Sequence, residues 1–139
     1  MEELVRLDLP NILGSEKIAI ENAVIHAKKI GFSRERIEDM KTAVAEACIN
    51  AIEHGNKFSA EKKFIVTLEG NKNTLTIVVY DEGNGIDVTT IPKEISNENG
   101  YPKRRGYGVF LIRNLVDAYS FERVPGGGNN VKMTMHLNR

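Results

Sequence analysis

The sequence lacks several features that mark whole classes of protein. It has no tryptophan and a single cysteine, Cys48, so no disulfide can form within the chain. One lone thiol is typical of a reducing compartment such as the cytoplasm. No apolar run approaches the roughly 20 residues that span a bilayer, and the N-terminus has no apolar core of a signal peptide. We therefore expect a cytoplasmic protein that does not enter a membrane.

The chain also lacks an excess of charge of either sign. Its 19 Lys and Arg residues balance its 19 Asp and Glu residues over a length of 139 residues. A protein that binds nucleic acid or an anionic membrane through its overall field needs a basic excess. The composition therefore predicts no direct contact with nucleic acid, and any basic function has to be local.

Three familiar nucleotide motifs are missing as well. The sequence contains no G-x-x-x-x-G-K-[ST] segment and no G-x-G-x-x-G that opens a βαβ unit. The H-R-D and D-F-G segments of protein kinases are also absent. A nucleotide site in this chain would have to be built from other residues.

Apolar periodicity predicts the order β-α-α-β-β-loop-α-β-β in one domain that spans residues 1–139. Helices laid on one face of a mainly antiparallel sheet form a two-layer α+β sandwich. Ser15 and Ser33 are the expected helix N-caps, and Gly31 and Gly55 the expected ends of these helices. The strands are expected at 4–9, 64–68, 74–80, 120–124 and 131–137, and the helices at 15–31, 33–54 and 107–118.

A long irregular segment, residues 87–105, separates the third strand from the third helix. It is rich in asparagine, glycine and basic residues and has no apolar periodicity. Loops of this length in a compact domain are usually functional or disordered. We expect a lid that a nucleotide orders, with a disordered surface loop as the alternative.

The segment E-A-C-I-N-A-I-E-H-G, residues 46–55, holds a carboxylate and an amide one helical turn apart. At ~100° per residue, Asn50 lies about 40° from Glu46, on the side opposite the apolar stripe. One interpretation is a solvated helix face. The other is that the Asn50 amide oxygen binds Mg²⁺, which prefers oxygen ligands, while Glu46 deprotonates an attacking group. The stripe consists of Ile37, Met40, Val44, Cys48 and Ala51.

The segment D-E-G-N-G-I, residues 81–86, follows a strand that the pattern predicts to be buried. A polar turn is one explanation of it. The other is that the Asp81 carboxylate accepts a hydrogen bond from the exocyclic amine of adenine. Guanine has a carbonyl at that position and cannot donate this bond. Gly83 and Gly85 would let the backbone pass close to a flat ligand.

The segment R-R-G-Y-G-V-F-L-I, residues 104–112, opens the third predicted helix. Free N–H groups at a helix N-terminus suit phosphate oxygens, and Gly106 and Gly108 would keep that approach open. Arg104 and Arg105 lie just upstream, where bidentate donors can hold a terminal phosphate. An isolated G-x-G carries no such meaning, but this one follows the Asp-x-Gly-x-Gly turn and a long loop. The run Gly126-Gly127-Gly128, by contrast, predicts only a hairpin turn.

In their order and spacing, these three segments resemble the signature of the ATPase superfamily of gyrase, heat-shock chaperone, histidine-kinase and mismatch-repair domains. Within it, the size of the chain is most similar to the bacterial anti-sigma serine kinases. The resemblance implies a Bergerat-type ATP-binding fold with ATP and Mg²⁺ as cofactors. It makes Glu46 the catalytic base and Asn50 the metal ligand, and it puts Asp81 on adenine and Arg105 on the γ-phosphate. The implied nucleotide-binding set is Asn50, Asp81, Gly83, Gly85, Ile86, Arg104, Arg105, Gly106, Gly108 and Val109.

The resemblance also implies partners. Members of that family sequester a sigma factor of RNA polymerase as homodimers and phosphorylate a serine of an antagonist, or anti-anti-sigma, protein. Two alternatives remain open from the residues alone: a nucleotide-dependent binding module without kinase activity, and a stand-alone ATPase. The presence of Glu46, a candidate base, favours the kinase.

Overall fold

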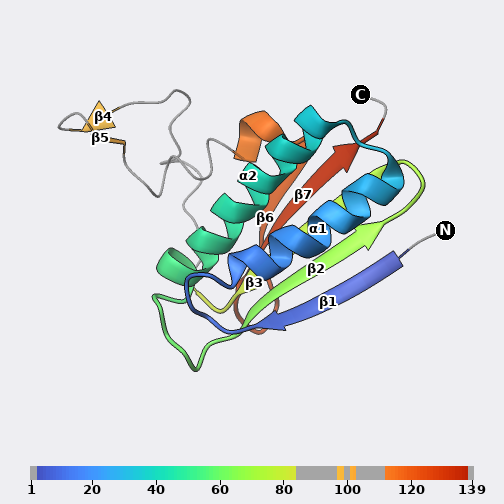
Figure 1. The fold of residues 1–139 in the computed structure, drawn as a ribbon. Coiled ribbons are helices and arrows are strands. Elements are labelled where there is room, and N and C mark those ends of the chain that lie inside the picture. Colours follow the sequence, from blue (N-terminus) through green and yellow to red (C-terminus); the bar gives the residue numbers. More distant parts are fainter. Residues whose placement is uncertain (1–2, 84–96, 99–100, 103–111, 138–139) are drawn as a thin grey trace.

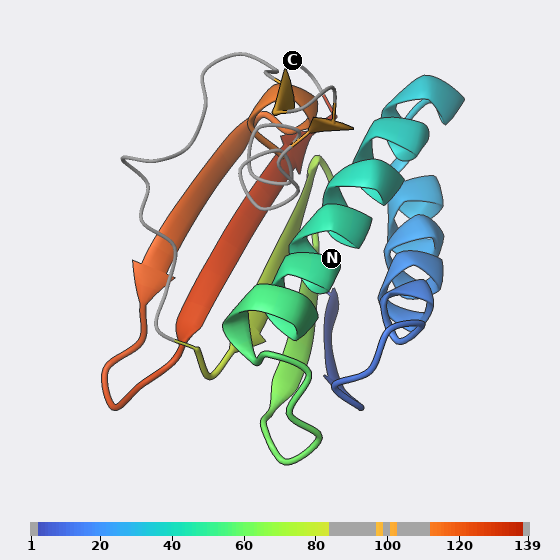
Figure 2. The ribbon, with the colours of Figure 1, turned by 90° about the vertical axis from the view of Figure 1, so that its left-hand side faces the viewer.

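A computed structural model shows two helices packed on one face of a five-stranded antiparallel sheet of order β1-β2-β3-β7-β6 (Figures 1 and 2). The structure describes residues 3–83, 97–98, 101–102 and 112–137. The predicted two-layer α+β sandwich is confirmed. The sheet strands are β1 (Glu3–Leu9), β2 (Phe64–Gly70), β3 (Thr74–Asp81), β6 (Ala118–Arg123) and β7 (Asn129–His136), and the helices are α1 (Glu16–Ile30), α2 (Arg34–Asn50) and the π-helical turn η1 (Ala51–Gly55).

The two helix starts differ in how they are capped. At α2 the Ser33 hydroxyl accepts a hydrogen bond from the Arg36 amide at 3.2 Å, as the sequence predicts. At α1 Ser15 occupies the predicted N-cap position, but its side chain makes no capping hydrogen bond. The carboxylate of Glu16 instead accepts from the Gly14 amide at 2.7 Å. Gly31 ends α1 in the left-handed conformation, at φ 105°.

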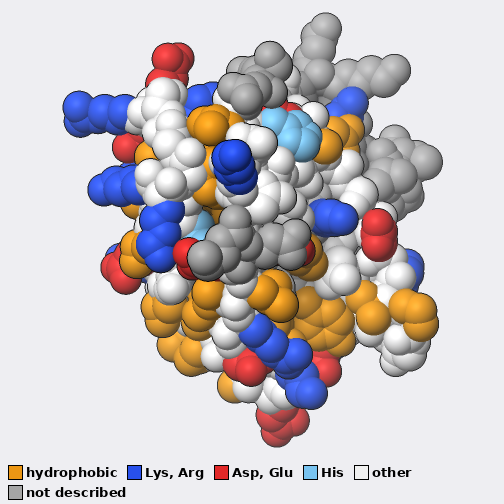
Figure 3. Space-filling view, turned by 90° about the vertical axis from the view of Figure 1, so that its right-hand side faces the viewer, with side chains coloured by type: hydrophobic (Ala, Val, Ile, Leu, Met, Phe, Trp, Pro, Cys, Tyr) orange, Lys and Arg blue, Asp and Glu red, His pale blue; other side chains and the backbone are white. Residues whose placement is uncertain are grey.

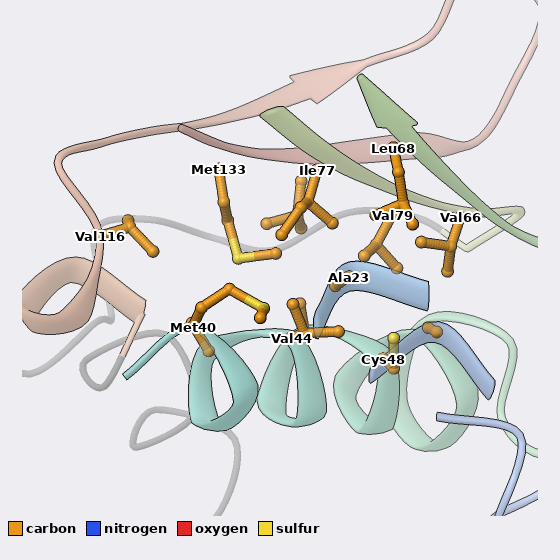
Figure 4. Packing of buried hydrophobic residues seen from close by; sticks show 14 of the residues in the cluster. Ala23, Met40, Val44, Cys48, Val66, Leu68, Ile77, Val79, Val116 and Met133 are labelled. Carbon is orange, nitrogen blue, oxygen red and sulfur yellow. The ribbon is translucent and has the colours of Figure 1, made fainter. Parts of the chain in front are cut away.

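The core lies between the helices and the sheet, and its side chains follow the predicted periods (Figure 4). Every second residue of β2, β3 and β7 points inward, while α1 and α2 contribute residues three and four apart. Cys48 is fully buried here, and this burial raises the pKa of its thiol far above the usual range, so it is a core residue rather than a reactive group. Facing side chains shown in Figure 4 are Ala23, Met40, Val44, Cys48, Val66, Leu68, Ile77, Val79 and Met133.

The third predicted helix is shorter at its C-terminal end than the sequence suggests. Residues 112–115 are helical, and β6 begins at Ala118, which the sequence pattern had placed inside the helix. The Asp117 amide donates to the Thr134 carbonyl at 3.0 Å, so pairing with β7 ends the helix. Tertiary pairing of this kind overrides a local helical pattern.

A largely buried ion pair connects the residues just before β6 to the start of α2. The guanidinium of Arg36 lies 2.6 Å from the Asp117 carboxylate, and the two side chains are 15% and 11% exposed. Arg36 also donates to the His136 carbonyl at 3.1 Å, and the His136 amide donates to Asp117 at 2.7 Å. The pair therefore joins α2, β7 and the chain that enters β6.

Arg36→Ala should lower the free energy of unfolding by about 3 kcal/mol, because it removes the Arg36 cation from a pair that is largely buried. Urea unfolding measures the change. Arg34→Ala, two residues away on an exposed position, is the matched control and should stay within about 0.5 kcal/mol of the parent. Equal losses in both variants would mean that the pair contributes nothing specific.

Most of the predicted lid lies outside the described residues. Within it the structure describes two short strands, β4 (Asn97–Glu98) and β5 (Tyr101–Pro102), which pair with each other and not with the main sheet. Among the described residues, no helix is both long and apolar enough to cross a bilayer.

Candidate nucleotide-binding site

The end of α2 departs from regular α-helix just where the first motif lies. After Asn50 the chain widens into the π-turn η1, which the Asn56 amide closes by donating to the Ala51 carbonyl at 2.7 Å. The sequence predicts an α-helix through this stretch, and the π-turn was missed. Such turns often occur at functional sites because they shift the side chains of a helix by one position.

Asn50 is buried, with 6% of its surface exposed. The solvated-face interpretation is therefore wrong for this residue. Its Oδ1 atom accepts no hydrogen bond from any residue in the described part of the chain. A buried amide oxygen without a donor is costly unless something else occupies it. A hard cation fits this atom, since Mg²⁺ prefers oxygen ligands and keeps several waters.

Glu46 lies one turn before Asn50 on α2 and is half-buried. Positions four apart on a helix share one face, so both side chains serve the same side of α2. Within the described part of the chain, no cluster of three or more His, Cys, Asp or Glu side chains could hold a metal ion.

Asp81 ends β3 and is 7% exposed. Its Oδ1 atom accepts from the Gly83 amide at 2.8 Å and from Asn129 Nδ2 at 3.0 Å. Asn129 Nδ2 also donates to the Gly83 carbonyl at 2.9 Å, and Arg123 Nη1 donates to Asn129 Oδ1 and to the Gly83 carbonyl, each at 2.8 Å. Asp81 and the turn after it are therefore held in one orientation.

Sheet register produces this network. Asp81 of β3 pairs with Asn129 of β7, which pairs in turn with Arg123 of β6. The three side chains thus form a row across three neighbouring strands. The sequence motifs contain neither Asn129 nor Arg123, because their relation to Asp81 depends on which strands pair.

Burial raises the pKa of the Asp81 carboxyl above its usual 3.8, against the opposing effects of Asn129, Gly83 and the charge of Arg123. A buried carboxylate held by hydrogen bonds on one oxygen suits recognition of a hydrogen-bond donor on a ligand. The exocyclic amine of adenine is such a donor.

Two glycines, Gly55 and Gly83, permit the close packing around Asp81. A side-chain Cβ at Gly55 would overlap the Asp81 carboxyl group, and one at Gly83 would overlap the Gly55 carbonyl. Neither glycine has a positive φ, so the reason for glycine here is space. Gly55, predicted only as a helix stop, therefore also brings η1 against Asp81.

The glycine run 126–128 turns between β6 and β7 with all three φ angles positive, as the predicted hairpin requires. Gly128 also packs against β3, where a larger residue would not fit, since a Cβ there would lie 2.6 Å from the Asp81 carbonyl oxygen.

Asn56 is a structural residue that the sequence motifs did not reveal. It is completely buried, and its Nδ2 atom donates to Asn11 Oδ1 at 3.0 Å and to the Lys63 carbonyl at 2.8 Å. Its Oδ1 atom accepts from the Glu82 amide at 2.8 Å. One side chain thereby fixes the end of η1 to the turn that follows Asp81. Its position directly after the first motif was the available clue.

The remaining predicted residues cannot be placed. Gly85, Ile86, Arg104, Arg105, Gly106, Gly108 and Val109 lie outside the described residues. Of the predicted set, the structure brings together Asp81 and Gly83, with Glu46 and Asn50 on the helix that leads through η1 to them.

Comparison with known proteins decides the family. The model of the histidine kinase-like ATPase domain matches residues 16–135, which is most of the chain. The protein belongs to this family. The match spans every element from α1 to β7, so it covers the helix with Glu46 and Asn50 and the strand with Asp81.

The similar proteins include serine-protein kinases and anti-sigma factors. A serine-protein kinase RsbW from Bacillus licheniformis is 33% identical over 118 residues, which are 81% of this chain and 72% of the relative. An anti-sigma F factor from Thermoanaerobacter sp. (strain X514) is 35% identical over 106 residues, covering 74% of this chain and 72% of the relative. The match to an RsbW from Bacillus thuringiensis (strain Al Hakam) is 30% identical and covers all of this chain and 89% of the relative.

A solved structure confirms the fold. The crystal structure of the RsbU and RsbW domains of a Mycobacterium tuberculosis protein matches with a TM-score of 0.68 at 17% identity. The match covers 99% of this chain and 33% of that longer one. The protein thus shares its architecture with one part of a multidomain protein.

Proposed function

We propose that this protein is an ATP-dependent serine protein kinase and anti-sigma factor. It sequesters a sigma factor of RNA polymerase and transfers the γ-phosphoryl group of ATP to a serine of an antagonist protein. Family membership and the names of the similar proteins support this proposal. The observation that carries it is the buried Oδ1 atom of Asn50, which has no hydrogen-bond partner among the described residues. Asn50 lies one helical turn after the candidate base Glu46, and the π-turn η1 that follows it packs against Asp81.

Each residue has a role in the proposed reaction. Asp81 accepts from the adenine amine, and Asn50 holds Mg²⁺, which neutralises phosphate charge. Glu46 takes the hydroxyl proton of the acceptor serine. The serine oxygen bonds to the γ-phosphorus as the bond between that phosphorus and ADP breaks. Arg105 stabilises charge on the transferred group, and Gly83, Gly85, Ile86, Arg104, Gly106, Gly108 and Val109 complete the nucleotide site.

The partners, assembly and location belong to the same proposal. A sigma factor and an anti-anti-sigma antagonist are the protein partners, the protein acts as a homodimer in the cytoplasm, and residues 87–105 form the nucleotide-dependent lid. The names of the similar proteins support the two partners. Light scattering of the protein alone tests the dimer directly, since a monomer has a mass of 15.5 kDa.

The deciding experiment is transfer of label from γ-labelled ATP to purified candidate antagonist proteins, followed by mapping of the labelled residue. A labelled serine on one antagonist supports the kinase. Nucleotide-dependent binding of a partner without any label would support the binding module, and phosphate release without an acceptor would support the stand-alone ATPase.

Asn50→Ala should weaken Mg-ATP binding roughly 10- to 100-fold, the effect of losing an interaction with a charged group worth about 1.5–3 kcal/mol. Calorimetric titration with and without EDTA measures it. The difference between parent and variant should vanish in EDTA, since only the metal contact is lost. A loss of affinity that persists in EDTA would contradict the metal role.

A further inference from the structure

A groove lies at the end of the helix pair where α1 passes into α2. The C-terminal half of α1 and the first turns of α2 enclose a groove of about 370 Å³ that is open to solvent. A volume of this size accommodates a few side chains of a partner rather than a folded domain. The groove is lined by Val24, Lys28, Arg34, Ile37, Glu38 and Lys41.

The floor of the groove is apolar. Val24 of α1 and Ile37 of α2 are half-buried, and both pack against the core from the groove side. Because the core holds them from beneath, they present a fixed apolar surface between the two helices. An aliphatic side chain of a partner can therefore be buried there without any rearrangement of the helices.

The rim is basic. Lys28 and Arg34 are exposed, and neither makes an ion pair with a described residue. Lys41 lies 3.4 Å from Glu38, but the two side chains are 40% and 62% exposed, so this pair is weak and Lys41 can exchange its partner. The three cations outnumber the one carboxylate on the lining, although the chain as a whole is neutral.

This surface is separate from the nucleotide site. Arg34 and Asn50 stand at opposite ends of α2, and sixteen residues at 1.5 Å each place them about 24 Å apart along the helix. Figure 3 shows that Lys and Arg side chains also line one border of a face on which hydrophobic side chains gather. Basic and apolar surface therefore adjoin on this molecule despite its balanced charge.

We propose that the groove between α1 and α2 binds an acidic segment of a partner protein. An aliphatic side chain of that segment enters between Val24 and Ile37, and carboxylates on either side of it pair with Lys28 and Arg34. A free phosphate would leave the apolar floor exposed, and a nucleic acid would meet Glu38 at the rim. The proposal stands without the proposed kinase activity, because no residue of the groove belongs to the nucleotide site.

The test uses NMR titration of the ¹⁵N-labelled full chain with a blocked twelve-residue peptide that has two central leucines flanked by glutamates. Its comparators replace the leucines by serine, or the glutamates by lysine. Amide shifts should concentrate around Val24, Lys28, Arg34 and Ile37, and both comparators should bind at least tenfold more weakly. Inorganic phosphate, added alone, should not produce the same shifts.

The double variant Lys28→Glu/Arg34→Glu should bind the acidic peptide at least tenfold more weakly. Lys17→Glu/Lys132→Glu is the matched control, because it makes the same change in charge at exposed positions on the first turn of α1 and on the opposite face of the sheet. This control should bind within about twofold of the parent. Circular dichroism melting shows that both variants are folded.

Three results would overturn the proposal. Equal weakening in the two double variants would show binding to overall charge. Equal affinity of the serine comparator, or phosphate shifts at the same amides, would show a simple anion site. Shifts distributed over the whole surface would show that the groove is not a site.

Discussion

Glu46→Gln should slow phosphoryl transfer to the acceptor serine by roughly 10²–10⁴-fold, the effect of losing a general base. The amide has nearly the shape of the carboxylate but cannot take a proton from the serine hydroxyl. Because Glu46 is proposed to act on the acceptor rather than on the nucleotide, Mg-ATP affinity should change little. Single-turnover transfer and calorimetric titration separate the two quantities.

Glu53→Gln is the matched control for this experiment. Glu53 is a half-buried carboxylate on the adjoining η1 turn, so its replacement removes the same charge from nearly the same place. Its transfer rate should stay within a few-fold of the parent. An unchanged rate in Glu46→Gln would remove the base assignment and leave Glu46 as a residue of the helix surface.

Asp81→Asn should lower ATP affinity by at least 100-fold, because it places an NH₂ group or a weaker acceptor against the adenine amine. A site built around a buried hydrogen bond discriminates by about 10⁴–10⁵ when that bond is left unpaired, so a hundredfold loss is the lower bound. The internal bonds from Gly83 and Asn129 fall on Oδ1, which Asn retains. The fold should therefore persist, and an affinity within twofold of the parent would contradict the adenine role.

The pH dependence of stability gives this variant a second readout. Since burial raises the folded-state pKa of Asp81 above its usual 3.8, the folded protein holds this proton more tightly than the unfolded chain. The stability that the folded protein gains from binding this proton is fully present below pH 3.8 and is lost as pH rises through the folded-state pKa. Without nucleotide, Asp81→Asn should thus gain stability relative to the parent as pH rises from 3.8 through the folded-state pKa, measured by urea unfolding.

Much of the fold was predictable because its elements are amphipathic with clear periods. The alternation in β1, β2, β3 and β7 and the stripe on α2 place the core residues correctly, and their turns and helix ends follow from glycine and asparagine at the right points. One error falls where a tertiary contact prevails over local pattern, since pairing with β7 ends the third helix early. The other is local: the Ser15 side chain makes no capping bond, and the neighbouring Glu16 carboxylate accepts from the Gly14 amide at the start of α1.

The chemistry of the candidate site is encoded in short segments, since a carboxylate and an amide four residues apart must share a helix face. Their surroundings are not encoded locally. Helical periodicity places Asn50 on the side of α2 away from the core, yet Asn50 is buried. Its burial depends on what the rest of the chain packs over that side. Asn56 likewise acquires its partners from residues 45 positions earlier and 26 positions later in the chain.

The sequence by itself determined the secondary structure of most of the chain, the faces of its helices and strands, and the residue types available for holding a nucleotide. These depend on periods of 3.6 and 2 residues and on side-chain chemistry, which are local properties. Only the tertiary structure decided that Asp81, Asn129 and Arg123 form one row, that Gly55 packs against a carboxyl group, and that a basic groove opens between the helices. Strand register and helix packing are set by contacts between residues far apart in sequence, and no local pattern contains them.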